Sequence, residues 1–324
     1  MSIKIVTDST CDLPRELIHA HHISVIPLHI NKGEDSFLDG LEITPEDIFS
    51  YVEKGGDICT TAAPNPMELS EYFEELSLQY EAVIMITIGS SFSSCYQNAV
   101  IAASDFSNVY IVDSKNLSSG QGIIVMEAAK MAEQGVSPEK ICMRLENAAS
   151  RVNASFILDR LDYMRKGGRC SSVAALGANL MHLKPCIEVS GGIMRVGKKY
   201  RGSLEKVMYQ YTKDRISVPG NISDGRAYIV YPSAKREAVD AARQVLTEDK
   251  RFTDIQETFA GCTVAVSYTH LDVYKRQPIV ESIQMLLHFP SVMKEQAKFS
   301  EFLILLFPLF SETFYLFLLE VSYG

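Results

Sequence analysis

The sequence predicts an α/β protein: an amino-terminal doubly wound parallel sheet, followed by a second α/β domain with a mixed sheet. Strand-like and helix-like segments alternate up to residue 150, which is typical of parallel sheets. From residue 154 the segments shorten, and a Gly-Gly pair separates two apolar runs, which indicates a hairpin. We therefore expect one domain over residues 1–153 and another over residues 154–265.

The segment 82–100 shows the first pattern most clearly. Its apolar run 82–88 predicts a parallel strand that is covered on both faces. Ser93 or Ser94 is placed to cap the next helix, with Gln97 completing a capping box. Because a helix start carries free N–H groups and a positive dipole end, this place suits an anion. Ordinary turn and capping roles explain the same serines.

The remaining elements of the first domain follow from local capping and turn signals. In chain order we expect a strand at 3–7, a helix capped by Asp12, a buried strand at 23–30, a helix starting at Thr44-Pro45, a loop at 59–66 that opens the next helix, a strand at 109–113, a long helix after the turn 113–122, and a helix starting at Ser137-Pro138.

The second domain is expected to mix hairpins with crossover connections. In chain order we expect a strand at 154–158, helices at 159–165 and 173–183, strands at 186–190 and 193–196, a strand at 227–231, a helix at 234–246 and a strand at 255–259. The cations Lys166, Arg169, Lys198, Lys199 and Arg201 are expected on solvated loops.

Composition and motif spacing exclude several classes of function. A net charge of −9 without a basic block argues against a nucleic-acid partner. Seven cysteines without a Cys-x-x-Cys pair favour reduced thiols in the cytoplasm and argue against zinc. His19, His21 and His22 have no carboxylate or cysteine at ligand spacing, and Gly120-x-Gly122 lacks the third glycine of a dinucleotide site.

Taken together, six motifs resemble the DegV family over residues 1 to 265: Asp8–Pro14, Thr60–Pro64, Ser91–Gln97, Val112–Ser114, Leu161–Arg169 and Leu183–Pro185. The resemblance implies a bacterial, cytoplasmic, two-domain lipid binder of the EDD fold that holds one long-chain fatty acid, with no other cofactor and no metal. Several members are the acyl-carrying subunit of fatty acid kinase in phospholipid metabolism. The implied partner is therefore the catalytic kinase subunit, and membrane contact is transient at most.

The resemblance also assigns site residues. The fatty-acid carboxylate would be held by Thr61 and Ser93, with Thr60 and Ser94 beside them and Arg201 nearby. Apolar residues of the second domain would line a tunnel for the hydrocarbon tail: Leu158, Leu161, Met164, Leu176, Leu180 and Met181.

An enzyme is the competing class of function. Ser93 could serve a serine hydrolase or a phosphotransferase acting on a small acyl or phosphate substrate. The sequence has no Gly-x-Ser-x-Gly elbow around these serines and no phosphate-binding P-loop. The carrier reading, without catalysis by this chain, is therefore favoured.

The carboxyl-terminal segment departs from the family pattern. Members place a His-x-Gly-Pro turn and a last strand after a run like Gly261–Ala265, but Ser267 stands at the expected histidine position. Residues 266–277 can be encoded by an inverted repeat similar to a library-tagging adapter, so we interpret them as a translated adapter. We interpret 278–324 as an unrelated hydrophobic tail, with a membrane anchor as the alternative. We therefore expect the second sheet to lack its last strand and assign no role to His270.

Overall fold

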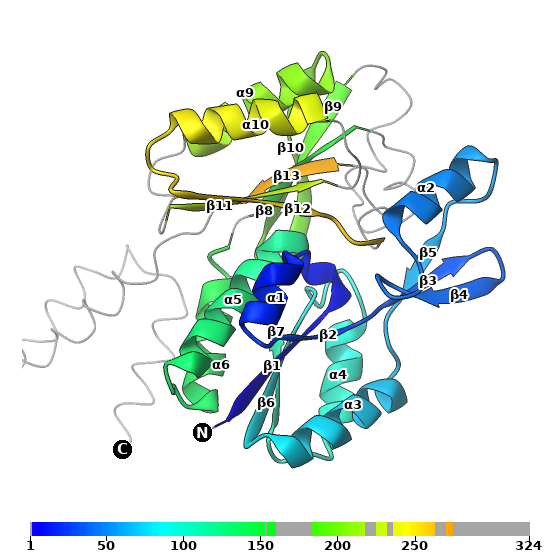
Figure 1. The fold of residues 1–324 in the computed structure, drawn as a ribbon, viewed down its shortest axis with the longest axis vertical. Coiled ribbons are helices and arrows are strands. Elements are labelled where there is room, and N and C mark those ends of the chain that lie inside the picture. Colours follow the sequence, from blue (N-terminus) through cyan, green and yellow to red (C-terminus); the bar gives the residue numbers. More distant parts are fainter. Residues whose placement is uncertain are drawn as a thin grey trace, which may run out of the picture. The chain divides into compact units, whose positions relative to one another are not determined.

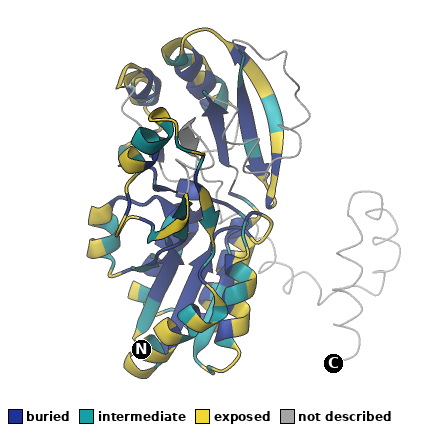
Figure 2. Ribbon diagram, turned by 90° about the vertical axis from the view of Figure 1, so that its right-hand side faces the viewer, coloured by how far each residue is buried: buried dark blue, intermediate teal, exposed yellow. Residues whose placement is uncertain are grey.

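The structure is a computed structural model that describes residues 2–152, 154–159, 183–217, 225–231 and 236–262, and the backbone of 270–274. Within these residues the chain forms a four-stranded, a six-stranded and a three-stranded sheet (Figure 1). The strands over residues 3–8, 82–87, 154–158 and 226–231 of the two larger sheets are mostly buried, and the helices around the sheets expose their outer surfaces (Figure 2).

The four-stranded sheet confirms the predicted parallel, doubly wound sheet. Its strand order is β2-β1-β6-β7, and every neighbouring pair is parallel. Helices α3 and α4 lie on one side of this sheet and α5 and α6 on the other (Figure 1). These elements are β1 (Ile3–Asp8), β2 (Ser24–Ile26), β6 (Ala82–Thr87), β7 (Val109–Asp113), α3 (Pro66–Gln79), α4 (Cys95–Ala103), α5 (Ser118–Glu133) and α6 (Pro138–Ala149).

Strand β6 is buried along its whole length, as its apolar run predicts. Its residues Val83 and Met85 pack with Phe73 of α3 in a fully buried cluster. Helix α3 starts where the sequence predicts, because Asn65 accepts from the amides of Met67 and Glu68 and thereby satisfies two unpaired helix donors.

The predicted strand over 23–30 is wrong: it is two strands in different sheets. Strand β2 ends at Ile26, and β3 (His29–Lys32) begins after Pro27, which has no N–H to donate to a ladder. Strand β3 lies between β4 (Asp35–Leu38) and β5 (Thr60–Ala62) in an antiparallel sheet that the sequence analysis missed. Helix α2 (Pro45–Glu53) follows at the predicted start, where Thr44 and Asp47 form a capping box.

The predicted helix cap at Asp12 is also wrong. A short 3-10 turn, η1 (Ser9–Cys11), intervenes, and Asp8 caps it by accepting from the Thr10 amide. Asp12 adopts a left-handed conformation with φ 46°, and its carboxylate accepts from the Gly261 amide and the Ser118 hydroxyl instead of capping α1 (Arg15–Ala20). Helix α1 therefore starts after Pro14 without a side-chain cap.

The six-stranded sheet confirms the predicted mixed sheet, with the order β10-β9-β8-β13-β11-β12. Helices α9 and α10 pack side by side over it (Figure 1). The predicted hairpin is present, with both glycines of Gly191-Gly192 at positive φ. The elements are β8 (Ala154–Leu158), β9 (Leu183–Ser190), β10 (Ile193–Arg201), α9 (Leu204–Ile216), β11 (Arg226–Tyr231), α10 (Arg236–Glu248), β12 (Asp254–Phe259) and β13 (His270–Tyr274).

Two expectations for this sheet are corrected. Strand β10 runs on to Arg201, so Lys198, Lys199 and Arg201 lie on a strand instead of a loop. The sheet does not lack a strand between β8 and β11, because β13 pairs antiparallel with both. Backbone hydrogen bonding needs no particular side chains, so a segment that departs from the family pattern can fill this position.

The expected helices at 159–165 and 173–183 fall almost wholly outside the described residues, as do Lys166 and Arg169 and the tail after Tyr274. Leu183 belongs to β9. In the part of the chain that is described, no helix combines the length and the apolar character needed to cross a membrane.

We predict that Phe73→Ala lowers the free energy of unfolding by about 3–5 kcal/mol, because it leaves a cavity in the α3–β6 cluster. Phe73 is fully buried and makes an edge-to-face contact with Phe106, with 6.2 Å between the two ring centroids. Urea unfolding followed by circular dichroism measures the change. Leu78→Ala, on the exposed face of the same helix, is the control and should change it by less than about 0.5 kcal/mol. Equal losses for the two variants would contradict this packing.

Candidate functional site

The loop 88–94, which we call the serine loop, joins β6 to α4 at the carboxyl edge of the parallel sheet. Its first two serines are held by the protein. Ser90 donates to the Asp113 carboxylate from its amide at 3.1 Å and from its hydroxyl at 2.6 Å. The Ser91 hydroxyl donates to the carbonyl oxygen of Gly192 in the β9–β10 hairpin. These two hydroxyl groups are therefore occupied.

Ser93 is held differently. Its hydroxyl oxygen accepts from the Cys95 amide at 3.3 Å, so Ser93 pairs one of the free donors at the start of α4. Ser94 is the N-cap residue but makes no capping bond with its side chain, and the capping box expected with Gln97 is wrong. Among the described residues, the Ser93 hydroxyl proton has only the Cys95 sulfur, 3.2 Å away, as acceptor. Because a thiol accepts weakly, a ligand oxygen could take its place.

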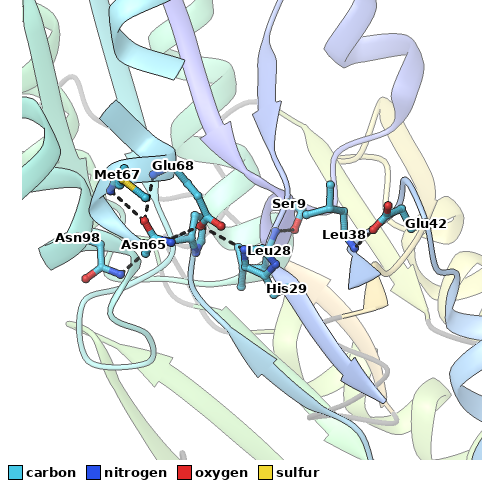
Figure 3. A network of polar contacts seen from close by, with 10 residues as sticks. Ser9, Leu28, His29, Leu38, Glu42, Asn65, Met67, Glu68 and Asn98 are labelled. Atoms are coloured by element: carbon cyan, nitrogen blue, oxygen red, sulfur yellow. Dashed lines mark hydrogen bonds and ion pairs between the residues drawn. The ribbon is translucent and has the colours of Figure 1, made fainter. Parts of the chain in front are cut away.

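Thr61 lies in β5, opposite Ile30 of β3. Thr61 is half-buried and Thr60 is exposed. The Thr61 hydroxyl makes no hydrogen bond to the described residues. Three residues later, the carbonyl oxygen of Pro64 accepts from the Asn98 side-chain amide at 2.8 Å (Figure 3). The Thr61 segment is therefore tied to α4, one helical turn from its start. That the Thr61 and Ser93 hydroxyls converge on one ligand stays a prediction.

A buried polar network lies beneath the serine loop. The Asp8 carboxylate, fully buried at the end of β1, accepts from the Ile88 amide at 2.7 Å and from the Thr10 amide at 3.1 Å. The side chain of Gln121 on α5 donates to the same carboxylate at 3.1 Å and to the Thr7 hydroxyl at 2.9 Å. The network joins β1, α5 and the first residue of the serine loop.

Burial sets the protonation of this region. Loss of solvent raises the pKa of the Asp8 carboxyl, and the hydrogen bonds from Thr10, Ile88 and Gln121 oppose that rise. Burial also raises the pKa of the Cys95 thiol, and the nearby Asp8 charge raises it further. Cys95 is therefore a protonated thiol at neutral pH, which makes it a poor nucleophile and a poor base.

Two more buried aspartates bind the chain that follows β12. Asp12 accepts from the Gly261 amide at 2.7 Å and from the Ser118 hydroxyl at 2.5 Å. Asp39 accepts from the Cys262 amide at 3.0 Å. These bonds anchor the residues that follow β12 to the segments after β1 and β4.

The remaining predicted ligand residues have no described contact with Thr61 or Ser93. Arg201 is exposed at the end of β10, and no hydrogen bond or ion pair between described residues joins it to Thr61 or Ser93. Of the predicted tunnel residues, Leu158 is fully buried in β8. The other five lie outside the described residues: Leu161, Met164, Leu176, Leu180 and Met181.

An open groove of about 360 Å³ lies beside the Thr61 segment but does not suit an anion. Its walls include Pro64 and three glutamates of α3, Glu68, Glu71 and Glu75. Figure 3 shows Glu68 directed to His29, with 3.2 Å between the His29 ring nitrogen and the carboxylate. These three glutamates would repel a fatty-acid carboxylate, so we do not assign the head group to this groove.

The described residues contain no cluster of three or more histidine, cysteine or acidic side chains that could hold a metal ion. His21, one of the three histidines considered above, instead contacts Glu133 of α5 at 2.6 Å. From its place directly after a predicted strand, Asp8 could hold a neighbouring loop or a ligand, or serve only in a turn or cap. In the structure it caps η1 and also holds the Ile88 amide at the start of the serine loop. Asn98 was missed, because no signal in the sequence marks it.

A comparison with protein families matches residues 2–270 to the DegV family, whose description is that of an uncharacterised protein. The chain belongs to the DegV family. A DegV domain-containing protein of Caldanaerobacter subterraneus is 31% identical over 264 residues, which cover 81% of this chain and 93% of the relative. This confirms the resemblance read from the motifs.

Solved structures of the family agree with the fold. A fatty-acid-binding DegV family protein from Thermus thermophilus superimposes with a TM-score of 0.78 at 28% identity, covering 86% of this chain and 100% of that structure. DegV from Bacillus subtilis, described as a fatty acid binding protein, gives a TM-score of 0.74 at 26% identity with the same two coverages. The predicted fold class is therefore confirmed.

We predict that Asp12→Ala lowers the free energy of unfolding by about 1.5–3 kcal/mol, because it leaves the Gly261 amide and the Ser118 hydroxyl without their carboxylate acceptor. Urea unfolding measures the change. Asp35→Ala, at an exposed position of β4, is the control and should stay within about 0.5 kcal/mol of wild type. A wild-type value for Asp12→Ala would show that this anchor adds nothing to stability.

Proposed function

We propose that this chain is a fatty-acid carrier that binds one long-chain fatty acid and catalyses no reaction. The hydroxyls of Thr61 and Ser93 donate to the carboxylate, with Thr60 and Ser94 beside them and Arg201 supplying positive charge. The observation that carries this assignment is the state of Ser93: a backbone amide orients its oxygen and only a weak acceptor takes its proton. Fatty-acid binding by the two solved relatives supports the ligand class.

The hydrocarbon tail and the head group contribute different amounts to the free energy of binding. Burying about sixteen carbons contributes on the order of 12 kcal/mol at roughly 0.8 kcal/mol per methylene, before ordering costs. A hydrogen bond to a carboxylate adds about 1.5–3 kcal/mol. The tail, expected along the predicted tunnel residues of the second domain, therefore sets affinity, and the hydroxyls set orientation and select the acid.

A fatty-acid carrier can also present its bound ligand to a second protein. A carboxylate held at the edge of a sheet can be offered to another protein while the tail stays shielded from water. We propose that a fatty acid kinase uses this arrangement to form an acyl phosphate. The family resemblance supports this step, and the proposal places the chemistry on the kinase.

A serine hydrolase is the less favoured function. A nucleophilic serine needs a base within hydrogen-bond reach. Among the described residues, Ser93 pairs with an amide and with the protonated thiol of Cys95, and neither can accept its proton during catalysis.

We predict that Thr61→Val and Ser93→Ala each weaken palmitate binding by about tenfold, because each removes one donor to the carboxylate. Mass spectrometry of lipid bound to purified protein and equilibrium partitioning from lipid vesicles measure the loss. Ser104→Ala is the control, since its hydroxyl bonds the Ile101 carbonyl at the far end of α4. Unchanged palmitate occupancy in the double variant would exclude this head-group site.

We also predict that the purified protein does not hydrolyse p-nitrophenyl palmitate or shorter esters, because no described residue offers Ser93 a base. Release of nitrophenol measures turnover. Hydrolysis that Ser93→Ala abolishes would replace the carrier proposal with the hydrolase.

A further inference from the structure

We propose that Asp8 is a positioning residue for carboxylate recognition: it fixes the start of the serine loop through the Ile88 amide, and so sets where Ser93 presents its hydroxyl. This inference rests on the proposed function and extends it to a residue that does not touch the ligand. Asp8 is fully buried, so it acts through the loop.

The two carboxylate oxygens have separate tasks. One oxygen accepts the Ile88 amide at 2.7 Å. The other accepts the Thr10 amide and the Gln121 side chain, each at 3.1 Å, as well as the Thr10 hydroxyl. The oxygen bonded to Thr10 and Gln121 therefore fixes the carboxylate to η1 and α5. The oxygen bonded to Ile88 holds the start of the serine loop in a fixed position relative to these elements.

The serine loop between Ile88 and Ser93 is held by its own hydrogen bonds and close packing, so the position of Ile88 determines the position of Ser93. The Gly89 amide donates to the Asn116 carbonyl at 2.7 Å, and the Phe92 amide donates to the Gly89 carbonyl at 2.8 Å. A Cβ atom at Gly89 would lie 2.9 Å from the Phe92 ring and 3.1 Å from the Asn116 amide, so the turn is closely packed. A shift of Ile88 would therefore move Ser93.

Asp8 also lies close enough to the start of α4 for its charge to act on the Cys95 thiol, two residues beyond Ser93. The carboxylate is thus near the proposed head-group site without being part of it. Removing the Asp8 carboxylate should therefore weaken the binding of a lipid that carries a carboxylate more than the binding of a lipid that has only the hydrocarbon tail.

The test compares palmitate with 1-hexadecanol, which has the same tail and no carboxylate. Partitioning of each radiolabelled lipid from phosphatidylcholine vesicles to delipidated protein gives two affinities and their ratio. Asp8→Ala leaves the Ile88 amide without an acceptor, and we expect the palmitate-to-hexadecanol ratio to fall by about tenfold. If Asp8→Ala does not fold, Asp8→Asn replaces it: its single oxygen stays on the side with two N–H donors, and its NH₂ group faces Ile88.

Thr10→Val is the matched control. It removes a hydroxyl from the same buried network but leaves the Ile88 bond intact, so it should lower stability and keep the wild-type ratio. A wild-type ratio in the folded Asp8 variant, or an equal fall in Thr10→Val, overturns the positioning role. If the wild-type protein itself fails to prefer palmitate, the proposed carboxylate site fails instead.

Discussion

A carboxylate taken out of water must be surrounded by donors, and the first domain meets this requirement for Asp8 with groups from three elements. Thr10 in η1, Gln121 on α5 and Ile88 after β6 all donate to it. Because desolvating such a group costs several kcal/mol, moving any of these elements away removes a donor that the buried carboxylate needs. Asp8 therefore ties β1, α5 and the start of the serine loop together at the carboxyl edge of the parallel sheet.

The alternating architecture could be predicted from the sequence because a strand buried on both faces must be apolar along its length, as β6 is. Prediction failed where strands are short. Strands β2 and β5 have three residues each, too few to show a period, and Pro27 separates β2 from β3 without changing the apolar pattern. Asp12 could not be placed because its backbone is left-handed and its partners, Gly261 and Ser118, lie far away in the chain.

For the candidate site, the sequence indicates which hydroxyls lie in turns but not how they are supported. The bond between Asn98 and Pro64 and the bond between Asp8 and Ile88 join segments far apart in the chain, and no local pattern specifies such pairs. The serines of one loop also look alike in sequence. Only their partners distinguish Ser90, which Asp113 holds, from Ser93, whose proton has a weak acceptor.

The place of β13 in the second sheet has a consequence for biosynthesis. This strand lies between β8 and β11, yet it is the last of them to leave the ribosome. Until it emerges, β8 and β11 each present an open edge with unpaired amides and carbonyls. The amino-terminal sheet, whose strands are all complete by Asp113, can form early, whereas the second must wait for nearly the whole described chain.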